Sequence, residues 1–160
     1  MVLDRDFWEL ASFVVTVFGL PAAMLIFVFE QHKERENEEE NVYQLLSDNY
    51  QDFLKITLEN SDLRLFSPDE TPELSDEQKE RMQIIFSMLI SLFERAYLLL
   101  YEDNMSDKQR RRWSSWEDYM QEWLSRGDFR TLLPVLLRGE DPEFVAHFKR
   151  LADDSAAASA

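Results

Sequence analysis

The feature that most constrains this chain is an uncharged run of twenty residues near its start, Leu10–Phe29. It reads LASFVVTVFGLPAAMLIFVF and would be apolar on every side of a helix. A helix that crosses ~30 Å of bilayer hydrocarbon needs about 20 such residues. A soluble domain of this size rarely shields a helix that is apolar all round. The run therefore predicts a transmembrane anchor at residues 1–30.

A cleaved signal peptide is the main alternative to a retained anchor. Signal peptides begin with positive charge, carry an apolar run of about 7–15 residues and end at small residues. Here Asp4–Asp6 carries both signs, the run is longer, and the charged stretch Glu30–Lys33 follows directly. We therefore expect the segment to remain in the protein.

Lysine and arginine near the ends of a span set its orientation. Arg5 precedes the run, and Lys33 and Arg35 follow it. We expect a single-pass protein of the inner (cytoplasmic) membrane, with the N-terminus outside and the C-terminal domain in the cytoplasm. The lipid bilayer is then a predicted partner.

Four residues at mid-span interrupt the large side chains: Gly19, Pro21, Ala22 and Ala23. Proline removes a backbone donor and can kink a helix. Small residues let membrane helices pack closely. The four predict a tolerated kink, a hinge or a surface for helix packing in an oligomer.

The net charge of −15 is spread unevenly. Residues 30–80 hold 16 acidic and 5 basic side chains, whereas residues 81–160 hold 13 and 11. Bulk charge therefore excludes nucleic-acid binding of the usual kind. The acidic half should also be repelled by anionic lipid, so it stands away from the membrane or faces a basic partner.

Residue types that the sequence lacks exclude several kinds of chemistry. It contains no cysteine, and therefore has no disulfide, thiolate nucleophile or cysteine metal site. Three glycines are too few for a phosphate-cradling loop. His32 and His147 are far apart and lack companions at metal-ligand spacing. We predict no catalytic residues, no metal and no cofactor, and hence a protein that is not an enzyme.

Beyond the anchor, the sequence predicts an all-α protein. Residues 31–41 (QHKERENEEEN) are polar on all sides and rich in helix formers, which predicts a charged helical stalk or, alternatively, a disordered linker. Residues 42–152 predict a small helical cytosolic domain, and residues 153–160 a flexible tail. Capping boxes at Ser75 and Ser106 mark two helix starts. The expected helices are Val42–Leu58, Asp76–Tyr101, Asp107–Ser125, Phe129–Leu137 and Asp141–Ala152.

The segment Asp76–Tyr101 is apolar enough to raise the question of a second span. Glu94 and Arg95 interrupt its apolar part, and charges there cost a few kcal/mol each in a bilayer. We therefore predict a central core helix, part of which neighbouring subunits cover. Because a buried carboxylate needs a partner, Glu94 and Arg95 predict a structural ion pair. The candidate partners for Glu94 are Arg81, Arg112 and Arg130.

One basic cluster precedes a stripe of tryptophans. The candidate ligand-binding residues are Lys108, Arg110, Arg111, Arg112, Trp113 and Trp116. Arginine beside an aromatic ring can hold a phosphate and stack on a base, which suggests a nucleotide or an anionic lipid. The alternative is that the arginines pair with the acidic surface of residues 30–80, while the helically spaced tryptophans pack in the core.

The order of these features resembles a group of uncharacterised bacterial single-span membrane proteins with a short helical cytosolic domain. The resemblance lies in Leu10–Asn41, Tyr50–Phe66 (YQDFLKITLENSDLRLF), Leu92–Tyr101 (LFERAYLLLY) and Arg111–Trp123 (RRWSSWEDYMQEW). It implies membrane anchoring and a helical domain, and it carries no activity or site residues.

These patterns together predict a non-enzymatic, membrane-anchored interaction module. We expect it to self-associate or to serve as an accessory subunit of a membrane complex. One alternative is an oligomeric pore-forming or membrane-disrupting effector gated by the cytosolic domain. The other is a sensor that binds a nucleotide or anionic lipid at Arg110–Arg112 and the tryptophans.

Overall fold

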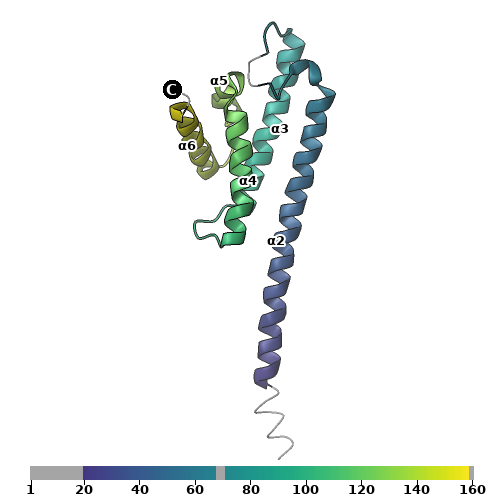
Figure 1. Cartoon of the computed structure of the whole chain (residues 1–160), viewed down its shortest axis with the longest axis vertical. Helices are drawn as coiled ribbons and strands as arrows, with labels where there is room; N and C mark the ends of the chain where they lie inside the picture. Colours follow the sequence, from purple (N-terminus) through teal and green to yellow (C-terminus); the bar gives the residue numbers. More distant parts are fainter. Residues whose placement is uncertain (1–19, 68–70, 159–160) are drawn as a thin grey trace, which may run out of the picture. The chain divides into compact units, whose positions relative to one another are not determined.

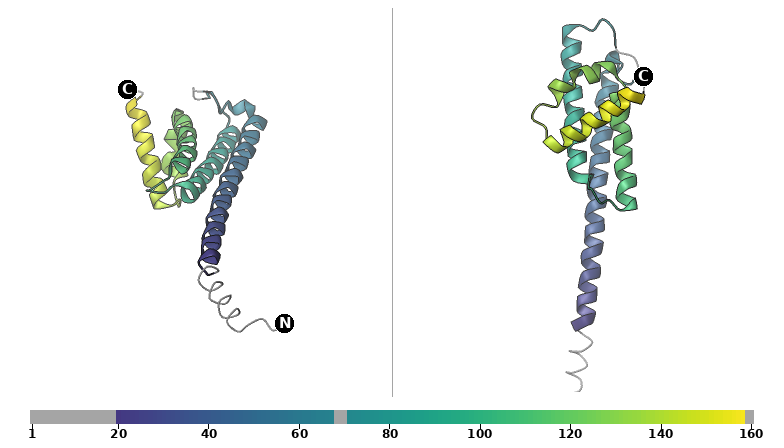
Figure 2. Two further views of the ribbon diagram at one scale, coloured as in Figure 1. Left: turned by 60° about the horizontal axis from the view of Figure 1, so that its bottom comes forward. Right: turned by 90° about the vertical axis from the view of Figure 1, so that its left-hand side faces the viewer.

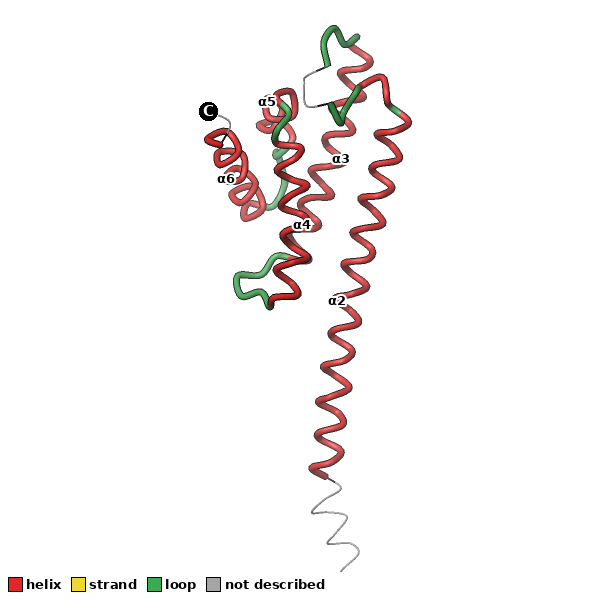
Figure 3. The backbone as a smooth tube through the Cα atoms, in the orientation of Figure 1, coloured by secondary structure: helices red, strands yellow, loops and turns green. Residues whose placement is uncertain are grey.

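The structure is a computed structural model that describes residues 20–67 and 71–158. Within these residues all regular structure is helical, as Figure 3 shows, so the all-α prediction is confirmed there. The helices are α2 (Leu20–Glu59), the short 3-10 helix η2 (Ser61–Leu63), α3 (Asp76–Leu100), α4 (Asp107–Leu124), α5 (Gly127–Leu136) and α6 (Pro142–Ala158).

The chain divides into two units, Met1–Val42 and Tyr43–Ala160, and α2 contributes to both. In the first unit, residues 20–42 are helical, including the predicted stalk at 31–41. Residues 10–19 of the predicted span, with Gly19, lie outside the described part. Pro21, Ala22 and Ala23 lie in the helical backbone of α2. The described residues therefore include only part of the predicted span and of its predicted hinge.

Large apolar side chains follow one another without interruption in the first unit. Met24, Leu25, Ile26, Phe27, Val28 and Phe29 are each 59–72% exposed. Six consecutive residues cover every side of a helix, since one turn takes 3.6 residues. This part of α2 is therefore apolar all round and uncovered.

Among the described helices, α3 is the one long and apolar enough to cross a membrane by length and composition. It lies in the middle of the chain, not near its start. It also buries nine side chains inside the second unit, including Phe86, Leu89, Ile90 and Phe93. That burial supports the prediction of a central core helix.

In the second unit, the end of α2 and the helices α3 and α4 lie side by side, and α6 crosses α3 and α4 (Figures 1 and 2). Ring contacts give the directions of the helices. Tyr50 meets Tyr119 and Phe53 meets Trp123, so α2 and α4 run parallel. Tyr97, near the end of α3, meets Trp113, near the start of α4, so those two helices are antiparallel.

Capping boxes begin both central helices, as predicted. The Ser75 hydroxyl accepts the Gln78 N–H and the Gln78 side chain accepts the Ser75 N–H; Ser106 and Gln109 repeat the pattern. Each box satisfies two backbone donors that a helix start leaves unpaired. The two signals therefore fix where α3 and α4 begin.

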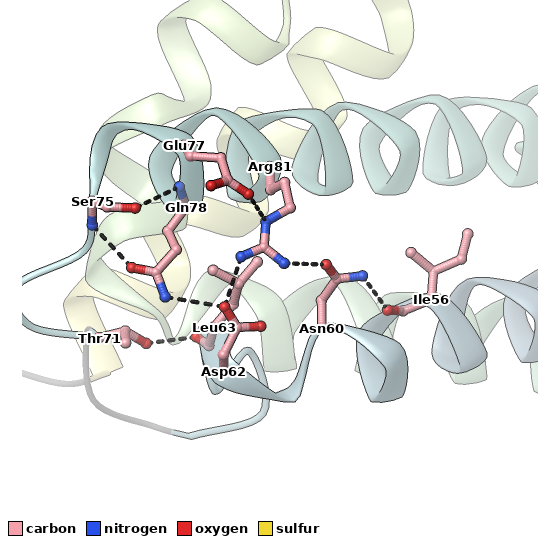
Figure 4. A network of polar contacts seen from close by, with 9 residues as sticks. All are labelled: Ile56, Asn60, Asp62, Leu63, Thr71, Ser75, Glu77, Gln78 and Arg81. Atoms are coloured by element: carbon pink, nitrogen blue, oxygen red, sulfur yellow. Dashed lines mark hydrogen bonds and ion pairs between the residues drawn. The ribbon is translucent and has the colours of Figure 1, made fainter.

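A polar network joins the end of α2 to the start of α3 (Figure 4). Arg81 of α3 donates to Asn60 at 2.9 Å and to Asp62 at 2.7 Å. The Gln78 amide also donates to Asp62, at 3.0 Å, while Asn60 donates to the carbonyl of Ile56 at 2.8 Å. The network thereby holds the ends of two consecutive helices, which η2 and a loop connect, at one corner.

A buried arginine holds the segment after η2, and the sequence did not reveal it. Arg126 is 3% exposed, and its Nη1 donates to the carbonyls of Arg64, Leu65 and Ser67 at 3.1, 3.0 and 2.6 Å. Its Nε and Nη2 form a forked pair with Asp128, at 3.0 and 2.5 Å. The guanidinium thus neutralises a carboxylate and satisfies three carbonyls together.

The last helix is longer than predicted. The expected end was Ala152, with a flexible tail from 153, whereas α6 continues to Ala158. The added residues read DDSAAA, and alanine is the best helix former. Intrinsic propensity therefore carries the helix past its last buried side chain.

Replacing Arg126 with alanine should lower the free energy of unfolding by about 3–5 kcal/mol, because Asp128 and three carbonyls lose their partner in a buried place. Urea unfolding in detergent micelles, followed by tryptophan fluorescence, measures the change. Arg111→Ala, at an exposed position, should stay within about 0.5 kcal/mol of the parent chain. Equal losses in the two variants would contradict a structural role for Arg126.

Candidate functional site

Helix α4 distributes its tryptophans between two sides of the domain. Trp113, Trp116 and Trp123 are 3%, 2% and 2% exposed, so the core-packing interpretation of the stripe is confirmed. Trp113 contacts Tyr97 and Tyr101 of the α3 end and His147 of α6. Trp116 faces α2, where its ring meets Tyr50 edge-on at 5.8 Å. The stripe therefore joins α4 to α2, to the end of α3 and to α6.

A groove of about 310 Å³ lies along the seam between α2 and α4. Aromatic rings dominate its lining, and a few polar groups stand at its rim. The lining residues are Tyr43, Ser47, Tyr50, Gln51, Leu54, Phe66, Trp116, Tyr119 and Glu122.

Packed rings form the floor of the groove. Tyr50 and Tyr119 stack with centroids 4.4 Å apart, and Trp116 meets Tyr119 edge-on at 5.9 Å. The Trp123 Nε1 lies 3.5 Å from the Tyr50 hydroxyl, to which it donates. Burial raises the pKa of Tyr50 to about 12, so its phenol stays neutral at physiological pH. The floor is therefore uncharged and rigidly stacked.

The two ends of the groove differ in charge. At one end the Arg112 guanidinium lies over the Tyr43 ring, 5.0 Å from its centroid. At the other end stands Glu122, whose side chain is exposed. Its carboxylate is near enough to Tyr50 to contribute to the raised pKa of that phenol.

The predicted ligand-binding cluster is divided by the fold. Lys108, Arg110 and Arg111 are exposed on the first turns of α4, and Arg112 packs on Tyr43. Trp113 and Trp116 are buried, so their faces are not available to stack a base. Helical spacing turns the rings inward while the basic residues stay outside. The nucleotide or anionic lipid suggested from the sequence would thus meet the basic side chains without the tryptophans.

The predicted ion pair of Glu94 and Arg95 needs correction. Arg95 is exposed, and Glu94 Oε1 accepts the N–H of Asp141 at 2.5 Å. Its carboxyl also hydrogen-bonds to that of Glu140. The turn between α5 and α6, where Gly139 takes a left-handed φ of 87°, brings these groups to α3.

The three arginines considered as partners for Glu94 have other contacts. Arg81 binds Asn60 and Asp62, and Arg112 lies on Tyr43. Arg130 donates to the carbonyl of Leu124 and, at 2.9 Å, to that of Ser125.

The contact between Glu94 and Glu140 brings two carboxyl groups together. Burial, the hydrogen bond to Glu94 and the negative charge of Glu94 raise the pKa of Glu140 to about 7. Two adjacent carboxyl groups bind a proton between them more readily than either does alone. The neighbouring Asp141 accepts the N–H groups of Glu143 and Phe144, which caps the start of α6. Glu140, with its raised pKa, therefore directly precedes the residue that caps α6.

His147 is a further titratable group, and the sequence did not reveal that it is buried. It is surrounded by the rings of Tyr97, Tyr101 and Trp113, with centroids 5.2, 5.2 and 5.6 Å away. Burial lowers its pKa, so the imidazole is neutral at pH 7, and its Nε2 lies 3.4 Å from Glu117. Its place three residues after Phe144 on one face of α6 was the available signal. No cluster in the described part of the chain has the ligands for a metal ion.

Comparisons of the chain with protein-family models, with curated proteins and with solved structures find no match. No relative therefore lends this chain an activity or a partner, and its own residues must suggest both.

The Glu94–Glu140 contact predicts how stability varies with pH. Because folding raises the pKa of Glu140 from 4.5 to about 7, its contribution to stability is complete below pH 4.5 and is lost as the pH rises to about 7. Glu140→Gln should remove this dependence and unfold at a higher temperature than the parent chain at pH 8. Thermal unfolding at pH 4.5, 6 and 8 measures the effect.

A matched variant is Glu143→Gln, which changes an exposed carboxylate two residues after Asp141. It should leave the slope between pH 4.5 and 7 as it is in the parent chain. If Glu140→Gln keeps that slope too, a raised pKa of Glu140 is not its cause.

Proposed function

We propose that this protein is a non-enzymatic, membrane-anchored helical interaction module. It is a single-pass protein of the inner membrane, with its N-terminus outside and its helical domain in the cytoplasm. It self-associates or serves as an accessory subunit of a membrane complex. The resemblance to single-span bacterial membrane proteins points the same way.

The main support for the proposed membrane anchor is the exposed apolar run at Met24–Phe29. Covering one large apolar side chain stabilises it by about 1.5–3 kcal/mol, so the six together favour a covered state by roughly 10 kcal/mol. Because they surround the helix, a partner on one side cannot cover them. A bilayer covers all sides at once, and the uncharged residues 10–23 before the run give it the required length.

Association is supported by an apolar strip on α3, formed by Ile84, Met88, Leu98 and Leu99, which are 44–56% exposed. At 100° per residue these four positions fall within one 100° arc of the helix. Ser91, also exposed, lies on the same arc near the middle of the strip. Exposed Arg95 lies on this arc too, so a second copy would place the same strip against it antiparallel, with the small serines opposite each other and the two Arg95 side chains apart.

Membrane retention tests the anchor. Leu20→Arg combined with Met24→Arg places two charges one turn apart within the span, at about 2.5–3.5 kcal/mol each near its centre. We expect the parent chain to remain in carbonate-washed membranes and the double variant to be lost from them. Immunoblots of pellet and supernatant measure the partition.

The matched control is Glu36→Arg combined with Glu40→Arg, which has the same spacing in the stalk. It should stay with the membrane as the parent chain does. Release of the parent chain itself by carbonate would overturn the anchor.

Disulfide trapping tests self-association through the α3 strip. Since the chain has no cysteine, Ser91→Cys introduces a single thiol at the middle of the strip. Mild oxidation in membranes should give a covalent dimer, and adding Met88→Glu should reduce its yield several-fold. Ser114→Cys, exposed on α4, is the control and should stay monomeric. Equal trapping at both positions would indicate random collision.

A further inference from the structure

We infer that the groove between α2 and α4 is the docking site for a lysine- or arginine-bearing segment of a partner protein. The inference rests on the proposed role as an interaction module, and it names the chemistry of the partner. The groove lies entirely within the second unit, between residues 43 and 122.

The shape of the groove suits a stretch of polypeptide. A second hollow of about 120 Å³ lies next to the groove, and both are lined by Phe66 and Glu122. We call the two adjoining hollows together the track; its lining residues extend from Tyr43 to Arg126. Grooves lined by aromatic side chains are one of the recurring ways in which proteins bind an extended peptide segment.

The rings along the track suit a cationic side chain with an apolar stem. Phe66 is 54% exposed, and Tyr43 and Tyr119 are half-buried, so parts of these rings face the groove. The methylene groups of lysine or arginine pack on such surfaces while the charged end remains near water. The chain provides an internal example, because Arg112 already lies on the Tyr43 ring at 5.0 Å.

The charges along the track select a cation. Glu122 stands where the two hollows meet, which places a carboxylate beside Phe66. The Arg112 guanidinium lies at the opposite end of the groove, over Tyr43, so the site for a cation is at the Glu122 end. Within the second unit, residues 43–80 carry 10 acidic and 3 basic side chains, so an acidic segment would be repelled. A basic segment is attracted both by this field and by Glu122 directly.

Titration calorimetry on the full chain in detergent micelles tests the inference. The probe is the peptide Ac-Leu-Arg-Ala-Arg-Leu-amide, and its charge control is Ac-Leu-Glu-Ala-Glu-Leu-amide. We expect the arginine peptide to saturate one site per chain and the glutamate peptide to give no saturable binding. Saturable binding of both peptides would overturn the choice of a cation.

Two surface variants locate the binding site. Glu122→Gln removes the carboxylate and Phe66→Ala removes the exposed ring. Each change should raise the dissociation constant for the arginine peptide about tenfold. Glu102→Gln, an exposed carboxylate in the loop after α3, is the matched control and should bind as the parent chain does. Thermal unfolding of each variant verifies that the domain is folded. Unchanged affinity in folded Glu122→Gln would overturn the assignment.

Two further results would also overturn the inference. Tetramethylammonium chloride binding as tightly as the arginine peptide would make the groove a site for small cations. If the arginine peptide does not bind at all, the groove is not a docking site for a basic segment. Neither result affects carbonate retention or the Ser91→Cys dimer, so failure here is distinguishable from failure of the proposed function.

Discussion

The helical domain depends on covering α3, a helix with apolar side chains on most of its circumference. Its buried rings and aliphatic groups meet α4, α5 and α6, each of which supplies large side chains such as Trp123, Phe129 and Phe148. Burial on this scale is the main favourable term in folding a small domain. The polar interactions add to this core. Capping boxes and the Arg81 network hold the ends of the helices that the core brings together.

The same aromatic residues explain why a groove exists between α2 and α4. Helices that meet through small side chains approach to about 8 Å, and larger side chains keep their axes further apart. Here the contact is made by stacked Tyr50 and Tyr119 and by the edges of Trp116 and Trp123. Flat rings fill the space between the axes and leave room at the rim. A recess with an aromatic floor is thus a consequence of how the domain packs.

Local patterns predicted the helices and much of the core, since capping boxes and apolar periodicity act within a few residues. They did not predict the contacts of Arg126 with residues 64–67, because those carbonyls lie about sixty positions away in the chain. The partner of Glu94 was missed for a similar reason. The turn at Gly139 places Glu140 and Asp141 beside α3. The position of that turn depends on how α5 packs in the domain, which local sequence patterns do not show. Of the candidate site, the sequence showed the residue types but not which side chains would be buried.

The protein has two exposed apolar surfaces, Met24–Phe29 and the strip on α3, and different surroundings would shield each of them from water. At Met24–Phe29 the side chains surround the helix, so a protein partner would have to enclose it completely, whereas lipid does so without specific contacts. The strip on α3 covers only one arc, which also contains Ser91 and Arg95, so a flat protein surface on one side is enough to cover its apolar side chains. The groove adds charge selection that neither apolar surface has. The proposed anchor, the proposed contact between copies and the proposed docking groove would thus each use a different set of residues and a different kind of interaction.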